Sequence, residues 1–304
     1  MENLEFSDRT VYDAPLTRCP LCSSTELVEH HLIKRYNPPF RTERCLSCGF
    51  IFMNPPLMDS TRAALYGEGY YTGHAEYAYY DERKAERHSQ YVWEKRVEKI
   101  RSFVKTGNVL DIGCAFGGFL KTLSRYYTPF GIDISPYAGT GAQAAFGKNN
   151  IHIGTLEDHP FRHNFFSVIT MIEVLEHIPE PSRAVSECYE LLTEGGLLVI
   201  QTANMNGLQA RILGKRYQYF LPGHLSYFNK YNIEMLLEKT GFSKIKFFHP
   251  VEFGLLPKLL KSRYNFTSIL DYRKWFRITL YHLLSKIRYR AFALTSSMVV
   301  YAIK

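Results

Sequence analysis

The chain has 304 residues, of which 46% are hydrophobic, and it carries a formal net charge of +8. This composition predicts one main domain and a smaller one, and the absence of any run of eighteen apolar residues argues against a membrane-spanning helix. Nine Lys or Arg and a single acid lie between residues 258 and 292. The net charge of this segment equals the net charge of the whole chain, so the rest of the chain is close to neutral. A protein that coats nucleic acid through general basicity is therefore not expected.

Four of the six cysteines form two pairs near the start, Cys19-Pro-Leu-Cys22 and Cys45-Leu-Ser-Cys48. Two thiolates two residues apart let one tight turn present both sulfurs to a single ion, so the pattern predicts a structural zinc ribbon over residues 1–58. Disulfides or reactive thiols are the alternative. The first residues have neither the basic nor the apolar stretch of a secretory signal, so we expect a reducing, cytoplasmic location.

Residues 59–105 are predicted to connect the zinc ribbon to the main domain. A charged amphipathic helix is expected over 81–105. The segment before it is rich in aromatic residues, which either stack against a sugar or pack the two domains together. These residues are Tyr66, Tyr70, Tyr71, Tyr77, Tyr79 and Tyr80.

From Gly107 onward, short apolar runs alternate with stretches of helical length. This alternation predicts an α/β domain over 106–304, with a parallel, doubly wound, Rossmann-like sheet. A helical insertion at 258–292 precedes the last strand. The seven predicted strands are 109–112, 130–134, 151–153, 166–171, 197–202, 245–248 and 297–303, and the helices between them are 119–126, 138–146, 182–192 and 233–239.

The first of these strands leads into a glycine-rich turn, Val109-Leu-Asp-Ile-Gly-Cys-Ala-Phe-Gly-Gly. Gly113 and Gly117 let the backbone turn sharply and allow a ligand to approach closely. Asp133 closes the next strand, where a carboxylate can accept hydrogen bonds from both hydroxyls of a ribose. Asp111 and Asp133 favour a cationic sulfonium nucleoside over a pyrophosphate, which predicts S-adenosylmethionine rather than a dinucleotide as the ligand.

Asp111-Ile-Gly-Cys-Ala-Phe-Gly and Gly131-Ile-Asp-Ile-Ser resemble motifs I and II of class I S-adenosylmethionine-dependent methyltransferases. Gly154-Thr-Leu-Glu-Asp and the stretch from Phe166 to Pro181 are similar to the motifs after strands three and four of that class. The resemblance covers roughly residues 107–304. It implies that Asp133 holds the ribose, that Gly113 and Gly117 flank the methionine part, and that Leu156 lies at the adenine. Thr155 departs from the acid that is frequent at its position, and Ser167 departs from a frequent Asp.

Methyl transfer needs alignment of the reactants and removal of the acceptor's proton. Glu173, Glu176 and His177 follow the fourth strand at spacings that place them on one face of a helical turn, and His224 follows the fifth strand across the same cleft. Three interpretations stay open. In the first, His224 is a general base. In the second, the four side chains hold a divalent ion. In the third, the glutamates stabilise a helix N-terminus, and His177 is a buried side chain whose hydrogen bonds are satisfied.

The Glu-x-x-Glu-His pattern with a later histidine resembles metal-using 2′-O-methyltransferases of small RNAs and the ubiquinone-pathway O-methyltransferases. The zinc ribbon, the tyrosine-rich segment and Gly223-His-Leu-Ser-Tyr-Phe together resemble bacterial deoxysugar C-methyltransferases. Those enzymes carry a large additional C-terminal domain, whereas this chain has only a short basic insertion. The resemblance implies a small-molecule or glycan acceptor in saccharide biosynthesis.

The insertion contains a predicted amphipathic helix over 272–292. We expect it to contact the inner face of an anionic membrane or a phosphate-bearing, lipid-linked acceptor, and a lid or dimer-packing helix is the alternative. Two other functions are kept as alternatives for the whole protein. One is a metal-assisted RNA 2′-O-methyltransferase, and the other is a non-catalytic regulator that binds nucleic acid.

Overall fold

The computed structural model describes residues 11–72, 86–248, 255, 259, 263, 268–284, 288–289, 292–293 and 297–304. Tyr77, Tyr79, Tyr80 and the predicted start of the helix at 81–85 lie outside these residues. In the described part of the chain, no helix is both long enough and apolar enough to cross a membrane.

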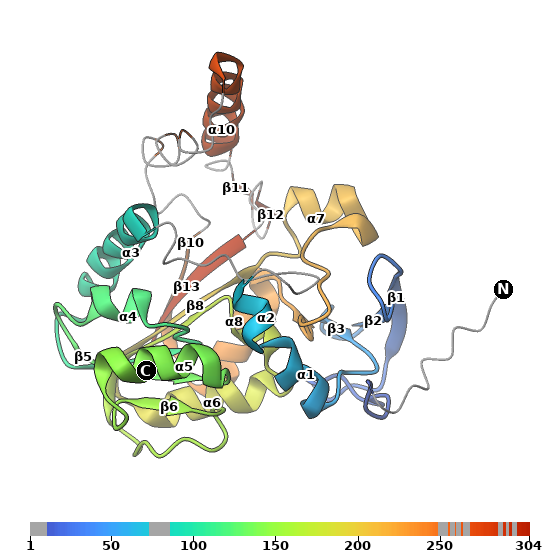
Figure 1. The fold of residues 1–304 in the computed structure, drawn as a ribbon. Helices are drawn as coiled ribbons and strands as arrows, with labels where there is room; N and C mark the ends of the chain where they lie inside the picture. Colours follow the sequence, from blue (N-terminus) through green and yellow to red (C-terminus); the bar gives the residue numbers. More distant parts are fainter. Residues whose placement is uncertain are drawn as a thin grey trace.

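A seven-stranded sheet forms the centre of the molecule (Figure 1). Its strands lie in the order β10-β13-β8-β7-β4-β5-β6. All seven predicted strands are confirmed. Their bounds are β4 Asn108–Ile112, β5 Thr128–Asp133, β6 Ile151–Ile153, β7 Phe166–Ile172, β8 Leu192–Ala203, β10 Ser243–Phe248 and β13 Ser297–Ile303.

Helices cover both faces of this sheet, because each central strand is apolar on both sides. Leu110, Ile169 and Leu198 pack with α6 and α8. Their chain neighbours Val109, Val168 and Val199 point the other way and pack with α3, α4 and α5. The helix bounds are α3 Glu86–Arg101, α4 Gly118–Leu123, α5 Pro136–Phe146, α6 Pro181–Leu191 and α8 Lys230–Thr240. The doubly wound arrangement is therefore confirmed.

The last strand departs from the expectation of a parallel sheet. β13 lies between β8 and β10 and runs antiparallel to both, whereas β4, β5, β6, β7 and β8 are paired in parallel. Antiparallel neighbours need no crossover helix packed on the sheet. The insertion before β13 therefore does not have to supply a crossover helix that packs on the sheet.

The helix in the insertion is shorter than predicted. After η4 (Ile269–Tyr272), helix α10 covers Arg273–Leu284, and β11 (Arg288–Tyr289) then pairs with β12 (Phe292–Ala293). The prediction of a helix as far as residue 292 was therefore wrong. Aromatic residues such as Tyr289 and Phe292 favour paired strands.

The N-terminal residues form a second, four-stranded sheet in the order β1-β2-β3-β9. Its first three strands, β1 Leu27–Ile33, β2 Phe40–Cys45 and β3 Ile51–Met53, come from the predicted zinc-ribbon segment. The fourth strand, β9 Ser226–Tyr227, comes from the main domain. The N-terminal sheet therefore includes residues far beyond the boundary expected at residue 58.

Two short helices lie between the N-terminal sheet and the main domain. They are α1 (Asp59–Leu65) and α2 (Glu68–Thr72), and α1 has no buried residue. A third short helix, α7 (Leu208–Leu213), follows β8 and leads through η3 (Gly214–Arg216) to the loop that carries His224.

Candidate active site

A cavity of about 840 Å³ lies at the carboxyl ends of the central strands. It is lined by residues that follow β4, β5, β6 and β7, by α1 and α2, and by the loop after α7. The order of the strands reverses between β4 and β7, and open α/β sheets bind ligands in the crevice at such a point. The volume is within the range of sites that enclose a small ligand.

The turn after β4 brings its backbone to the wall of the cavity at Gly113. The φ of Gly113 is +74°, and a Cβ there would lie 2.5 Å from Cγ2 of Val174. Gly117 also has positive φ, but a Cβ there would meet the ring of Phe146. This glycine therefore lets α4 begin beside α5, and it is not among the residues that line the cavity.

Asp111 is buried and accepts a 2.6 Å hydrogen bond from the hydroxyl of Thr170. It too is absent from the cavity wall.

Asp133 lies at the end of β5 and lines the cavity, where its side chain is held by the backbone. Its two carboxylate oxygens accept hydrogen bonds from the N–H groups of Ala115 (2.7 Å) and Ser135 (2.9 Å). Burial raises the pKa of this carboxyl above its usual value, while the two N–H groups act in the opposite direction. Each oxygen can still accept a second hydrogen bond, so the carboxylate is oriented for a ligand that offers two donors.

Leu156 is buried at the wall of the cavity in the turn after β6. Asp158 shapes this turn, because it accepts hydrogen bonds from the backbone N–H and the hydroxyl of Thr155. The Thr155 side chain is therefore engaged within its own turn, and Leu156 offers an apolar surface to a ligand.

Three of the four predicted catalytic side chains converge. The potential ligand atoms of Glu176, His177 and His224 lie within 4.8 Å of one another, and the rings of the two histidines meet edge to face at 4.6 Å between centroids. Glu176 and His177 belong to η2 (Leu175–His177), directly after β7. His177 and His224 line the cavity, and Glu176 lies beneath it with 1% of its surface exposed.

Hydrogen bonds to the backbone determine which nitrogen of each histidine carries the hydrogen. Nδ1 of His177 lies 2.8 Å from the carbonyl oxygen of Gly223, and Nδ1 of His224 lies 2.7 Å from that of Tyr219. Because a carbonyl only accepts, each Nδ1 carries the hydrogen, and each Nε2 keeps a lone pair. Metal-binding histidines are typically oriented by such bonds.

Burial sets the charges in this cluster. It lowers the pKa of His177 to about 4, and together with the neighbouring His177 it lowers the pKa of His224 well below 6.5. Both imidazoles are consequently neutral at pH 7. Burial and the charge of Glu173 raise the pKa of Glu176, and among the described residues neither of its carboxyl oxygens has a hydrogen-bond partner. A buried carboxyl in this position can receive a proton or a cation.

Glu173 is not part of this three-residue cluster. It lies at the end of β7 with φ at +57°, and its Oε1 accepts a 2.6 Å hydrogen bond from the side-chain amide of Gln201. The Gln201 oxygen in turn accepts from the buried Arg96 of α3. The expected helical turn with Glu173, Glu176 and His177 on one face does not form, because the positive φ at Glu173 turns the chain between the strand and η2.

The tyrosines of the connecting segment also line the cavity. Tyr66, Tyr70 and Tyr71 line it, and the hydroxyl of Tyr66 lies 2.7 Å from Nδ1 of His177. The sequence singled out these tyrosines but left open whether they stack against a sugar or pack the two domains together. It did not point to Arg62, Gln201 or Arg96, because a single polar residue in a helix or strand has no local pattern that marks it.

The four predicted zinc ligands also converge, outside the cavity. Sγ of Cys19 lies 3.7 Å from Sγ of Cys48, Sγ of Cys22 lies 3.6 Å from Sγ of Cys45, and all four sulfurs are within 4.8 Å of one another. A tetrahedral zinc with Zn–S bonds of about 2.3 Å has sulfurs about 3.8 Å apart. The residues present therefore fit a zinc ion, and all four cysteines are free of disulfides.

Comparison with known families identifies the main domain. The family described as "Methyltransferase domain" matches residues 85–246, just over half of the chain. The chain belongs to this methyltransferase family. Its cavity is lined by the segments that the sequence had related to motifs I and II and to the motifs after strands three and four.

Several curated relatives carry the name ubiquinone biosynthesis O-methyltransferase. That of Klebsiella pneumoniae subsp. pneumoniae is 31% identical over 105 residues, which is 33% of this chain and 43% of the relative. That of Coxiella burnetii is 30% identical over 154 residues, which is 49% of this chain and 60% of the relative. The methyltransferase thus spans about half the length of the curated relatives that it matches.

A solved structure agrees with the fold. Phosphoethanolamine N-methyltransferase 2 of Haemonchus contortus, in complex with S-adenosyl-L-methionine, has a TM-score of 0.51 and 20% identity to this methyltransferase. The match covers 84% of this chain and 62% of that one. The shared arrangement is that of a class I S-adenosylmethionine-dependent methyltransferase core.

Proposed function

We propose that this methyltransferase transfers the methyl group of S-adenosylmethionine to a hydroxyl oxygen of a small acceptor. The observation that carries the proposal is that Asp133, Leu156, His177 and His224 all line one cavity. One cavity thereby offers a place for the cofactor beside groups that can activate an acceptor.

The cofactor end is assigned from the placement of each side chain. Asp133, held by two backbone N–H groups, would accept hydrogen bonds from the two ribose hydroxyls. Leu156 would pack against the adenine, and Gly113 would let the methionine part approach the backbone. Gly117 and Asp111 would act indirectly, by shaping the turn and the strand that present Gly113.

At the acceptor end, His224 is proposed as the general base. Its neutral Nε2 would take the proton of the acceptor hydroxyl, while the oxygen forms a bond to the methyl carbon and the bond from carbon to sulfur breaks. The products are a methyl ether, S-adenosylhomocysteine and the proton on the imidazole. Glu173, held by Gln201, and His177, next to Tyr66, would orient the acceptor.

The same cluster favours a second form of this reaction, in which a divalent ion takes part. Glu176, His177 and His224 would hold the ion through one carboxylate and two imidazole nitrogens, a donor set that suits several transition metals. The ion would lower the pKa of a bound hydroxyl. What supports this form is that Glu176 is fully buried with no hydrogen-bond partner among the described residues.

For the acceptor, we infer a sugar or a glycan-linked or lipid-linked intermediate. Tyrosines that line a cavity provide faces for sugar rings. Arg62 and Arg183, which also line it, would suit a phosphate on the acceptor. Metal-assisted 2′-O-methylation of RNA would use the same cluster, whereas a non-catalytic nucleic-acid binder would have no use for it.

The four cysteines are proposed to have a structural role, and helix α10 is proposed to determine where in the cell the protein binds. We infer that Cys19, Cys22, Cys45 and Cys48 hold a zinc ion that folds the N-terminal segment, 1–58. We also infer that α10 contacts an anionic membrane surface from the cytoplasmic side. Its exposed Phe276, Leu280 and Leu283 lie at i, i+4 and i+7, beside Arg273 and Arg277.

The central test follows transfer of a labelled methyl group from S-adenosylmethionine to a panel of hydroxylated acceptors, including phenols and nucleotide sugars. His224→Asn is expected to lower the rate at least 100-fold, as expected for loss of a general base, while calorimetric affinity for S-adenosylhomocysteine changes less than twofold. A His224→Asn protein that transfers the methyl group at the normal rate would refute the proposal.

Titration with Mn²⁺ separates the two forms of the reaction. If the ion takes part, Glu176→Gln and His224→Asn will both lose Mn²⁺ binding, and a mild chelator will stop transfer while zinc is retained. If the base acts alone, the wild-type protein will bind no Mn²⁺ and the chelator will have no effect.

A further inference from the structure

The loop that carries His224 is bound on one side to the N-terminal sheet. β9, two residues after His224, pairs with β3, with Ile51 opposite Tyr227 and Phe52 opposite Ser226. The N–H of Met53 extends this pairing by donating a 2.8 Å hydrogen bond to the carbonyl of Leu225.

On its other side the same loop is bound to the cluster. The N–H of Leu225 donates a 2.8 Å hydrogen bond to the carbonyl of Glu176. The backbone of Leu225 therefore joins β3 to η2, and it does so at the residue next to His224. A shift of the N-terminal sheet would be transmitted to the distance between His224 and Glu176.

Arg35 holds the segment before His224. Its guanidinium donates hydrogen bonds to the carbonyls of Lys215 (2.9 Å), Tyr217 (2.9 Å) and Phe220 (2.6 Å). Tyr217 and Phe220 flank Tyr219, whose carbonyl accepts the Nδ1 hydrogen of His224. A planar guanidinium can bind three carbonyls in a fixed geometry, which a lysine cannot do.

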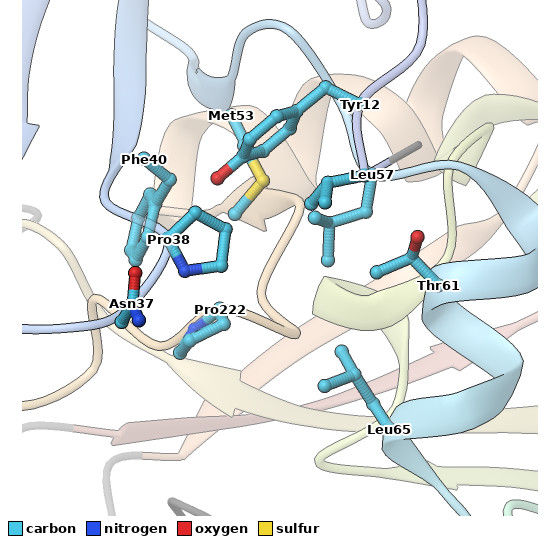
Figure 2. A pocket seen from close by; sticks show the side chains of 10 residues that line it. Tyr12, Asn37, Pro38, Phe40, Met53, Leu57, Thr61, Leu65 and Pro222 are labelled. Atoms are coloured by element: carbon cyan, nitrogen blue, oxygen red, sulfur yellow. The ribbon is translucent and has the colours of Figure 1, made fainter. Parts of the chain in front are cut away.

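Apolar side chains pack the two parts together. Figure 2 shows Pro222, from the His224 loop, beside Pro38, Phe40 and Met53 of the N-terminal segment, around a cavity of about 100 Å³. Tyr217, Phe220 and Tyr227 are buried in the same cluster as Ile33 and Phe40. The contact is thus a continuous core, which a merely tethered module would lack.

We propose that Arg35 is a positioning residue of the active site, and that the N-terminal sheet acts through it and β9 to orient the His224 imidazole. The proposal rests on the function proposed for His224. It gives the cysteine-rich segment a part in the reaction, because that segment supplies the surface against which the catalytic loop is held.

The test compares Arg35→Ala and Arg35→Lys with Arg18→Ala. Arg18 is a matched control, because its guanidinium also binds a carbonyl, that of Ser23, but within the N-terminal segment. In Arg35→Ala we expect amide hydrogen exchange at residues 219–227 to rise at least tenfold, because the loop opens more readily. We also expect the ¹⁵N spectrum of the His224 ring to change from the single Nδ1–H tautomer to a mixture of tautomers.

In the same variant, kcat should fall at least tenfold for any acceptor that the wild type methylates, with affinity for S-adenosylhomocysteine and zinc content unchanged. Arg35→Lys should recover part of the loss, and Arg18→Ala should match the wild type in every measurement. Wild-type exchange and a single tautomer in Arg35→Ala would overturn the proposal, as would simultaneous loss of zinc and cofactor binding. If His224→Asn retains transfer, the proposed function fails, whereas exchange and tautomer still decide the role of Arg35.

Discussion

Asp133 and Glu176 are both buried carboxyl groups at the edge of the sheet, but their surroundings differ. Two backbone N–H groups bind Asp133 and favour its charged form, whereas the described residues provide no hydrogen-bond partner for the carboxyl oxygens of Glu176. Burial raises the pKa of both. Asp133 is thus prepared to accept hydrogen bonds from the hydroxyl groups of a ligand, and Glu176 to receive a proton or a cation.

This difference predicts the effect of removing one charge. Asp133→Asn should weaken binding of S-adenosylhomocysteine at least tenfold in calorimetry, because hydrogen bonds to a charged acceptor contribute about 1.5–3 kcal/mol each. Asp59→Asn removes a carboxylate from the same cavity on the exposed α1, and it should change the affinity less than twofold. Equal losses in the two variants would mean that general negative charge attracts the cofactor and that Asp133 has no specific part.

Gly113 is the residue at which the backbone conformation matters most. Both Gly113 and Gly147 have positive φ, but a Cβ at Gly147 meets nothing within 4 Å, whereas one at Gly113 would lie 2.5 Å from Val174. Gly147 has φ +89° and ψ +150°, a backbone conformation that is nearly exclusive to glycine, so Gly147→Ala should lower the free energy of unfolding by about 1–3 kcal/mol. Gly113→Ala should lower it further and weaken cofactor binding as well. Urea unfolding and calorimetry check this, and equal effects of the two changes would contradict the assigned contact.

At the scale of elements, β1 and the His224 loop meet at a pair of histidines. The rings of His30 and His31 are 3.9 Å apart, and the edge of His31 faces Phe220 at 5.5 Å. Burial, with the charges of His31 and Arg44, lowers the pKa of His30 to about 4, and burial also lowers that of His31. Protonation is therefore unfavourable while the N-terminal sheet is folded.

The sign of the pH effect follows from these shifts. Between about pH 6.5 and 4 the unfolded chain binds more protons at His30 than the folded chain does, so the stability is fully present above pH 6.5 and falls as the pH is lowered. The melting temperature should decrease over this range, and His30→Gln should make the decrease smaller. An unchanged pH profile in His30→Gln would exclude this contribution.

For the whole molecule, α10 lies apart from the seven-stranded sheet (Figure 1). Phe276, Leu280 and Leu283 are 72%, 45% and 53% exposed, while His282 on the opposite side of the helix is buried. Nine basic residues and one acid in 258–292 would repel a second copy of the same surface. An anionic lipid surface would match both the charge and the apolar stripe, which is why we propose it as the partner of α10.

Vesicles that contain phosphatidylglycerol should therefore sediment with the protein, and those of phosphatidylcholine alone should not. Changing Phe276, Leu280 and Leu283 together to Ser should reduce binding at least tenfold. Ile212→Ser, at an equally exposed apolar residue of α7 (71%), should have no effect. Binding that persists in the triple variant would exclude α10 as the contact.

The sequence by itself determined the α/β fold of this methyltransferase and the end of the sheet at which a cofactor is expected. The alternation of strands and helices, the glycine turn and Asp133 are local patterns, and their placement in an α/β sheet follows from the order of the elements along the chain. The spacing of the cysteine pairs determined their convergence in the same way. Only the tertiary structure decided that Glu176 and not Glu173 joins the histidines, since one positive φ at Glu173 sends its side chain to Gln201. It alone showed that β9 completes the N-terminal sheet and that Arg35 reaches the His224 loop, because contacts between residues about 180 positions apart have no local pattern.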